Sequence, residues 1–188
     1  MFLGDEEFVS EFKKKPAAVR HHHVWVSGLL EHTLNVMRLA SFVSSQYENV
    51  NRDMLITGAF LHDIGKIREY RTLAGHVGKF EHTFEGRLIG HLVLGDRMLR
   101  EKAGLIESFP ESKLAQLSHM ILSHHGQHEW GAPVRPKTLE AVLLHYVDNI
   151  DAKANMFLEE LNRPHPLNAE WTQYSSVFGT ELFRGDGS

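Results

Sequence analysis

Apolar residues recur every three or four positions over several stretches of this chain, which is the period of an amphipathic α-helix. The first such stretch follows Ser27, a residue type that favours the position just before a helix. Its apolar face carries Leu29, His32, Val36, Ala40 and Val43. A second stretch begins near Asn51 or Asp53 and runs to Gly65, a residue suited to ending a helix. The pattern therefore predicts two helices, and His32 lies on the inward face of the first.

Three further helices are predicted in the second half of the chain. One spans about residues 84 to 103. The next has Pro110 in its first turn and stops at Gly126, and the last is opened by Pro136 and ended by Pro164. Proline suits a first turn because the backbone N–H that it lacks would have no partner within the helix there. Inside a helix, the same lack removes a hydrogen bond. Together these elements predict an all-α fold, an antiparallel assembly of five or more core helices.

The remaining segments are a lead-in over residues 1–26, an insertion near residues 67–82 and a tail over residues 164–188. Glycines with scattered β-branched and aromatic residues make the insertion an irregular loop or short hairpin, a natural rim for a pocket. The tail has enough aromatic area to pack on the core. Its aromatic residues are Trp171, Tyr174, Phe178 and Phe183. A length of 188 residues fits one compact domain, so residues 1–188 are predicted to form a single domain.

The composition is that of an ordinary globular protein, with 42% hydrophobic and 23% charged residues. No apolar run is long enough to span a bilayer, and the opening MFLGDEEF carries acids where a signal peptide carries basic residues. These features predict a cytoplasmic protein with no membrane partner. A net charge of −4 lacks the basic field with which a stand-alone nucleic-acid binder holds phosphates. A long polynucleotide would therefore need local basic patches or a helper domain.

Cysteine is absent, while histidine is abundant at 14 residues. A transition-metal site must then be built from imidazole and carboxylate groups. Residues of these types recur in order along the predicted helices: His32, His62, Asp63, His91, His124, His125 and Asp148. Taken singly, a histidine on an apolar face is more often satisfied by a backbone carbonyl, and Asp148 could pair with Lys153. Their joint occurrence on five predicted helices indicates a metal centre.

The ligand types also indicate a reaction. A carboxylate such as Asp63 can bridge two ions because it has two oxygens, while imidazoles complete the separate shells. Two ions about 3.5 to 4 Å apart clamp the attacking and departing oxygens of a phosphoryl displacement. In the string HDIGK, Lys66 follows the ligands closely and is suited to hold a phosphate oxygen or offset transition-state charge. Asp63 and Lys66 are therefore the candidate catalytic residues.

Other polar residues are weaker candidates for the same pocket. Arg87 and Arg135 could bind phosphates, but a solvated surface position is at least as good an interpretation. Further pocket candidates without a firm role are His23, His82 and His128. Glu31 is a candidate to orient a ligand imidazole, as carboxylates often do.

Several segments of the chain resemble the HD-domain phosphohydrolases. They are GLLEHTL at 28–34, HDIGK at 62–66, LIGHLVLGDRML around His91, LSHHG at 122–126 and LLHYVDNIDAK at 143–153. Within that superfamily they look closest to the catalytic domain of the YhaM-type 3′-to-5′ exoribonucleases, and the preceding FKKKPAAVRHHH extends the likeness over nearly the whole chain. The segment QHEWGAP is reminiscent of HD-GYP cyclic-dinucleotide phosphodiesterases, although the GYP triad is absent.

The resemblance implies how the ligands are shared. One ion would be held by His32, His62, Asp63 and Asp148. The second would be held by Asp63 with His91, His124 and His125. A single ion on the first set is the competing arrangement. The resemblance favours Mn²⁺, and the donor types also fit Fe²⁺, Ni²⁺, Co²⁺ or Zn²⁺.

A phosphohydrolase acting on a nucleotide or short single-stranded nucleic acid, in the manner of a 3′-to-5′ exonuclease, is the function expected from this resemblance. YhaM-type enzymes carry an N-terminal OB-fold module for which this sequence has no room, so contacts are expected with the scissile phosphate and one or two nucleotides. The alternatives are a nucleotide phosphatase, a cyclic-nucleotide phosphodiesterase, or a regulatory module that binds a nucleotide without turnover. The sequence leaves the oligomeric state open.

Overall fold

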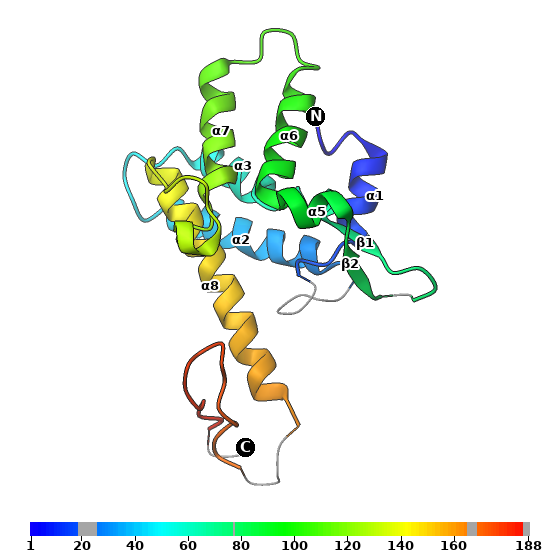
Figure 1. Cartoon of the computed structure of the whole chain (residues 1–188). Coiled ribbons are helices and arrows are strands. Elements are labelled where there is room, and N and C mark those ends of the chain that lie inside the picture. Colours follow the sequence, from blue (N-terminus) through cyan, green and yellow to red (C-terminus); the bar gives the residue numbers. More distant parts are fainter. Residues whose placement is uncertain (19–25, 77, 165–168, 186–188) are drawn as a thin grey trace.

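The computed structural model describes residues 1–18, 26–76, 78–164 and 169–185 (Figure 1). The helices of these residues are α1 (Glu6–Lys14), α2 (Gly28–Ser44), α3 (Arg52–Leu61), α4 (Lys66–Glu69), α5 (Phe84–Ile89), α6 (His91–Ala103), α7 (Glu111–Ser123) and α8 (Leu139–Asn162), with a 3-10 turn, η1, at His128–Trp130. The strands are β1 (Tyr70–Thr72) and β2 (Phe80–His82), which pair in antiparallel fashion. The prediction of an all-α fold with a short hairpin near residues 67–82 is confirmed.

The core lies where α2, α3, α7 and α8 meet. Helix α2 packs on α3 and α8, α3 packs on α7 and α8, and α6 pairs with α7 (Figure 1). Apolar side chains at helical spacing fill the space between them, as the periodicity predicts. Fully buried members are Leu29, Val36, Leu55, Leu99, Ile121 and Leu144. This packing buries the faces of the helices that also carry the ligand-type residues.

The starts of α2 and α3 follow the prediction in position, but only one follows it in mechanism. Asn51 caps α3, since its side chain accepts a hydrogen bond from the Met54 N–H at 3.0 Å. Ser27 precedes α2 but adopts a left-handed conformation with φ 72° and makes no side-chain cap. Its hydroxyl donates instead to the Lys13 carbonyl at 2.8 Å, which ties the start of α2 to α1. The predicted capping role of Ser27 is therefore wrong.

Helix α3 ends earlier than the pattern predicts. Its last residue is Leu61, so His62 and Asp63 lie in a turn rather than in a helical last turn. Gly65 does not terminate the helix, because it has an ordinary φ of −61° and immediately precedes α4. A Cβ at this glycine would lie 2.0 Å from the His91 carbonyl oxygen, so the residue serves the close packing of α4 against α6.

The predicted helix over residues 84–103 is two helices. They are interrupted at Gly90, whose φ of 76° and ψ of 159° are far from helical values and unfavourable for residues with a Cβ. The interruption makes His91 the first residue of α6 instead of a residue in mid-helix. A periodicity that continues across a single glycine cannot reveal such a change of direction.

Two proline predictions need correction. Pro110 lies just before α7 rather than inside its first turn, and α8 begins at Leu139 rather than at Pro136. Thr138 caps α8, because its side chain accepts from the Ala141 N–H at 3.2 Å. Helix α8 does end at Asn162, ahead of Pro164, as predicted. In the lead-in, α1 is an element that the sequence pattern did not reveal.

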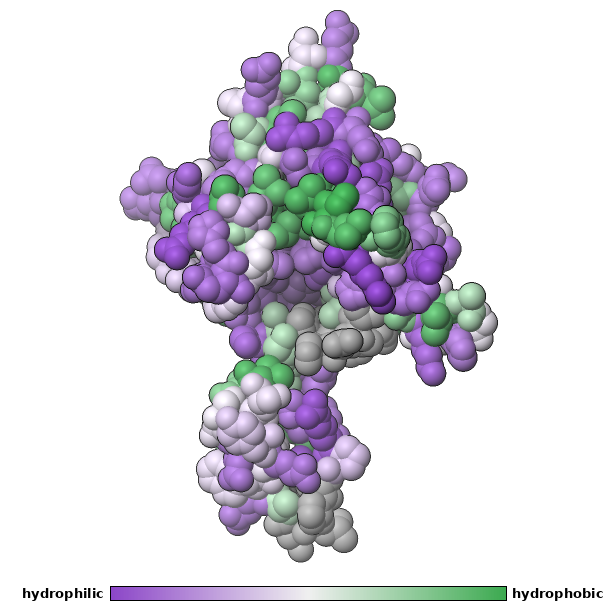
Figure 2. All heavy atoms as spheres, in the orientation of Figure 1, coloured by the Kyte–Doolittle hydropathy of each residue, from purple (hydrophilic) through white to green (hydrophobic). Residues whose placement is uncertain are grey.

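The C-terminal tail lies beside the last turns of α8, away from the main core (Figure 1). The rings of Phe157 and Phe178 are 5.4 Å apart, and the Arg184 guanidinium donates to the Leu161 carbonyl at 2.5 Å. Figure 2 shows this part as a separate lobe below the helical body. The tail thus packs on the projecting half of α8. No helix among the described residues is long and apolar enough to span a bilayer.

Candidate metal centre

Three ligand-type side chains meet inside the helical body. His32 comes from α2, His62 from the turn after α3 and Asp148 from α8. The Nε2 atoms of His32 and His62 lie 3.2 Å apart, and Asp148 Oδ1 lies 3.1 Å from the first and 3.7 Å from the second. Both imidazoles are fully buried. We refer to His32, His62 and Asp148 as the inner group.

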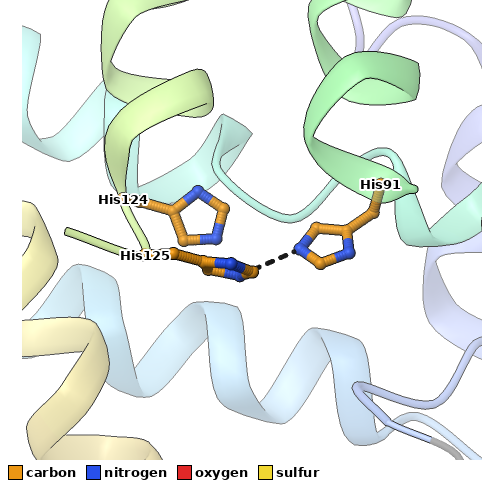
Figure 3. A group of neighbouring side chains, drawn as sticks. All are labelled: His91, His124 and His125. Atoms are coloured by element: carbon orange, nitrogen blue, oxygen red, sulfur yellow. Dashed lines mark hydrogen bonds between the residues drawn. The ribbon is translucent and has the colours of Figure 1, made fainter. Parts of the chain in front are cut away.

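A second set, the outer group, consists of His91, His124 and His125 (Figure 3). His91 begins α6, while His124 and His125 directly follow α7. The Nε2 atoms of His91 and His125 lie 3.2 Å apart, and the ring centroids of His124 and His125 are separated by 4.5 Å. His124 is buried, whereas His91 and His125 are half-buried. The ligand atoms of the group lie within 4.8 Å of one another.

Asp63 joins the two groups. Its Oδ2 atom lies 3.5 Å from the Nε2 atoms of both His32 and His62. Its Oδ1 atom lies 3.5 Å from His91 Nε2 and 3.7 Å from His124 Nε2. Oδ1 is buried and has no hydrogen-bond partner among the described residues, which is costly unless a cation or another donor satisfies it. Each oxygen of this carboxylate thus faces a different group, the arrangement of a bridging ligand.

The five imidazoles are oriented in the same way. In each ring Nε2 points into the cluster while Nδ1 faces an oxygen atom of the protein. These oxygens, with their distances, are Asp151 Oδ2 for His32 (2.7 Å), Ala59 O for His62 (2.7 Å), Glu69 Oε2 for His91 (3.1 Å), Ile121 O for His124 (2.8 Å) and Trp130 O for His125 (2.8 Å). Because carbonyls and carboxylates only accept, Nδ1 carries the proton and Nε2 presents its lone pair, as metal-binding histidines do.

The spacing of the ligand atoms fits bound metal ions. Donors placed tetrahedrally about 2.0 to 2.2 Å from one ion are separated by about 3.3 to 3.6 Å. The distances within the inner group, from Asp63 to the imidazoles and between His91 and His125 run from 3.1 to 3.7 Å. The donor set contains nitrogen and oxygen but no sulfur, which suits a divalent ion of borderline hardness. The residues present therefore fit one ion in each group, with Asp63 between them.

Burial and charge set the protonation of the cluster. Burial by itself raises the pKa of Asp63, but Lys66 and the surrounding imidazoles hold it well below its usual range. Burial lowers the pKa of His62 and of His124, and lowers that of His125 to about 4. These three rings are thus neutral at pH 7 and free to bind a cation.

His32 behaves differently from the other buried imidazoles. Burial lowers its pKa, but the hydrogen bonds with Asp148 and Asp151 outweigh this effect and raise it to about 9. Without a metal, His32 therefore carries a second proton at neutral pH. A metal ion in the inner group would take the place of that proton, because both are cations attracted by the same carboxylates.

A cavity of about 370 Å³ opens over the cluster. Its floor contains His32, Asp63, His124 and Asp148, and its walls add Lys66, Trp130, Asn149, Lys153 and Met156. Lys66 is buried, and its Nζ lies 2.5 Å from Asp63 Oδ2. A larger cavity of about 510 Å³, lined mainly by residues of α1, α4 and α6, contains none of the seven predicted metal ligands. The smaller one is therefore the candidate site, with a mixed wall of cations, an amide and apolar groups.

Several predicted pocket residues lie elsewhere. Arg87 is exposed on α5, and His128 is exposed on η1 with its Nδ1 2.8 Å from the Ala132 carbonyl. Neither lines the cavity over the cluster, whereas Arg135 lines a neighbouring one. His82 lies on β2 with its ring 5.0 Å from that of Tyr70, and His23 falls outside the described residues.

The sequence did not single out the carboxylate that orients His32. Glu31 is exposed on α2, while Asp151, one turn beyond Asp148 on α8, holds the ring. The three-residue spacing of these two aspartates places them on one helix face and could have indicated this role. Glu69, which faces His91, and Trp130 carried no comparable signal, because only the fold brings them to the cluster.

Comparison with known proteins adds to this geometry. The model of the HD domain family matches residues 29–153. The 3′-5′ exoribonuclease YhaM of Bacillus subtilis (strain 168) is 42% identical over 172 residues, covering 92% of this chain and 52% of that protein. The protein of the same name from Bacillus velezensis is 40% identical over 176 residues, covering 94% of this chain and 53% of that protein. The chain thus spans about half the length of the curated relatives it matches.

A solved structure shares the fold. The HD domain of the L. monocytogenes phosphodiesterase PgpH superposes with a TM-score of 0.50 and 18% sequence identity, covering 86% of this chain and 77% of that one. The predicted resemblance to HD-domain phosphohydrolases and to YhaM-type proteins is confirmed by these similarities.

Proposed function

We propose that this chain, which belongs to the HD domain family, is a metal-dependent phosphohydrolase that removes nucleotides from the 3′ end of short single-stranded nucleic acids. One observation carries the proposal. The buried carboxylate of Asp63 directs one oxygen to each of two groups of imidazole and carboxylate ligands. Such a paired site is the arrangement used for displacements at phosphorus. The exoribonuclease named in the related Bacillus proteins supports the choice of substrate.

The residues divide between two divalent ions. The inner group with Asp63 would hold the first, and Asp63 with the outer group would hold the second. Both are proposed to be Mn²⁺. When bound, such ions lower the pKa of water and neutralise charge on a reacting phosphate. The protein's own part is to present five Nε2 atoms and two carboxylates at the floor of the cavity.

Lys66 is the proposed cation for the reacting phosphate. Its ammonium group lines the cavity and contacts the carboxylate that joins the two groups. A fixed cation aimed at developing negative charge is most effective in a buried site, where water screens it weakly. In the proposed hydrolysis a water oxygen bonds to phosphorus while the bond to the 3′ oxygen of the preceding nucleotide breaks. That oxygen leaves with a proton, and a nucleoside 5′-monophosphate is released.

The cavity also limits the size of the substrate. Its volume of about 370 Å³ lies toward the lower end of the range for small-molecule sites, which is about 300 to 1,000 Å³. The net charge of −4 offers no general attraction for a long polyanion. The site is therefore proposed to engage the terminal nucleotide and a near neighbour, so that a trinucleotide is hydrolysed about as efficiently as a longer strand.

The test uses the full chain reconstituted with Mn²⁺ and a single-stranded RNA labelled at its 5′ end. We expect a ladder of products shortened from the 3′ end, together with released nucleoside 5′-monophosphates. Asp63→Asn is expected to abolish the ladder, whereas the matched control Asp53→Asn, at an exposed position on α3, should not alter it. Release of inorganic phosphate, opening of a cyclic nucleotide alone, or no turnover with Mn²⁺, Fe²⁺, Co²⁺, Ni²⁺ or Zn²⁺ would contradict the proposal.

A further inference from the structure

A second cavity adjoins the one over the metal cluster. It has a volume of about 340 Å³ and is lined by the two residues before η1, by the loop that leads into α8 and by the first half of α8. Arg135, Tyr146 and Gln127 contribute polar groups or an aromatic ring to its lining. His145 lines both cavities, so a single imidazole ring forms the wall between them. The two cavities therefore lie next to each other, with His145 as the residue that they share.

Three rings follow one another across this wall. Trp130 lines the metal cavity, His145 lines both cavities and Tyr146 lines the second. The ring centroids of Trp130 and His145 are 5.8 Å apart, and those of His145 and Tyr146 are 5.0 Å apart. Trp130 is 52% exposed and Tyr146 is 61% exposed. Each outer ring is thus accessible from solvent, and an exposed aromatic ring can stack on a nucleic-acid base.

The position of these rings is tied to the metal ligands. The Nδ1 atom of His145 lies 2.8 Å from the His124 carbonyl, and the Trp130 carbonyl lies 2.8 Å from Nδ1 of His125. Gly126, with φ 81°, allows the His145 ring to lie against its backbone, since a Cβ there would come within 2.3 Å of that ring. The segment that supplies two ligands of the outer group therefore also fixes the wall between the cavities.

We propose that the second cavity binds the nucleotide that precedes the one being released. Its base would stack on Tyr146, and its phosphate would pair with the exposed guanidinium of Arg135. An aromatic face beside a cation is the combination with which proteins hold single-stranded nucleic acids without reading their sequence. The inference rests on the proposed function, because it assigns a second subsite for the same substrate. It also gives Arg135 a place next to the metal cavity, although not inside it.

The test compares two substrates that differ only in the leaving group. One is a dinucleotide, and the other is the methyl ester of the same terminal nucleoside 5′-monophosphate. Both release the same nucleotide by cleavage of the same bond, but methanol has no base to occupy the second cavity. Tyr146→Ala is expected to lower kcat/KM for the dinucleotide about 5- to 100-fold more than for the methyl ester, the range for the loss of one stacked base.

Matched variants identify the interaction. Tyr146→Phe keeps the ring and should retain most of the wild-type preference for the dinucleotide. Tyr47→Ala removes an exposed tyrosine that lines neither cavity and should change kcat/KM for neither substrate. Arg135→Ala is expected to weaken the salt dependence of oligonucleotide binding. The slope of the logarithm of the binding constant against the logarithm of the salt concentration should become less steep by about 0.7, the value for one phosphate of a single strand.

The outcomes separate this inference from the proposed function. If the wild-type protein cleaves the methyl ester but Tyr146→Ala affects both substrates equally, or neither, the subsite is refuted and the hydrolytic function stands. If the wild-type protein cleaves neither substrate with Mn²⁺, the proposed function fails and takes the subsite with it. A loss specific to the dinucleotide that Tyr146→Phe restores supports the subsite.

Discussion

The inner and outer groups use the same kinds of ligand in different surroundings. The inner group is built around His32 and His62, whose side chains are at most 2% exposed, whereas the side chain of His91 in the outer group is 14% exposed. His32 is held by a carboxylate oxygen at 2.7 Å, while the carboxylate oxygen facing His91 lies at 3.1 Å. The imidazoles of the inner group are thus less exposed than His91, and the contact that orients His32 is the shorter of the two. Ligand orientation that is determined before binding costs less when the ion arrives, so the inner ion should bind more tightly.

Removing the residue that joins the groups should have the largest effect. Asp63→Ala is expected to reduce the metal content from about two ions per chain to none, because each group loses an oxygen ligand. Turnover should fall about 10³-fold or more, since bound ions supply several kcal/mol of transition-state stabilisation. Elemental analysis after reconstitution with Mn²⁺ measures the first effect. Retention of one ion would show that the groups bind independently of this carboxylate.

Substitutions within each group should separate the two ions. His91→Ala is expected to leave one ion bound, because the inner group and Asp63 remain complete. His62→Ala is expected to lose the inner ion and to weaken the outer one, since it lies beside both Asp63 and His124. Metal titration followed by elemental analysis distinguishes these patterns. Equal loss of metal in both variants would remove the distinction between a tighter inner and a weaker outer ion.

Lys66 tests the chemistry without removing a ligand. Lys66→Ala is expected to lower kcat about 10²- to 10³-fold, the range for deleting one group that stabilises transition-state charge. The metal content should change little, because all seven ligands remain. Steady-state kinetics and elemental analysis on the same preparation measure both quantities. A loss of metal in proportion to the loss of activity would mean that Lys66 supports the conformation of Asp63 instead.

The carboxylates behind the ligands should have smaller effects. Asp151→Asn and Glu69→Gln each keep the shape of the side chain while removing its charge, and are expected to weaken metal binding about 10- to 100-fold. The effect of Asp151→Asn should be the larger and should concern the inner ion, since its contact with His32 is the shorter. Competition with a chelator measures the affinities. Circular dichroism confirms that each variant is folded, and a larger effect of Glu69→Gln would contradict the ranking.

The smallest expected effect is a difference in proton release. The pKa of metal-free His32 is raised to about 9, so binding at the inner group at pH 7 should release about one proton. The pKa of His125 is lowered to about 4, so this ring of the outer group has none to release. Calorimetric titration of His91→Ala in buffers of different ionisation enthalpy measures the inner release. An enthalpy independent of the buffer would contradict the assignment.

The raised pKa of His32 also predicts how the stability of the folded protein depends on pH. A folded-state pKa above the ordinary value of 6.5 means that the folded protein binds the proton more tightly than the unfolded chain. The stabilisation from His32 is therefore fully present below about pH 6.5 and is lost as the pH rises through about 9. In the metal-bound protein this dependence should be absent, because the ion replaces the proton. Thermal unfolding of both forms across this range measures the difference.

Local patterns were sufficient for much of the architecture. Helical periodicity located α2, α3, α7 and the body of α8, and the glycines of residues 67–82 indicated the hairpin. The periodicity failed at two points. Gly90 interrupts one continuous apolar pattern, and Ser27 bonds to the end of α1 instead of capping its own helix. The bond of Ser27 joins two separate helices, and the backbone conformation of Gly90 leaves no trace in the spacing of apolar residues.

The sequence alone determined the types and order of the ligand residues. Doublets of histidine and aspartate, with no cysteine, restrict the chemistry to nitrogen and oxygen donors, and the motifs around them identify the family. Only the tertiary structure decided that the two oxygens of Asp63 face opposite groups, that Asp151 orients His32, and that a second cavity with Tyr146 adjoins the first. Side-chain chemistry is a property of single residues, whereas orientation, burial and adjacency arise only when several helices pack against one another.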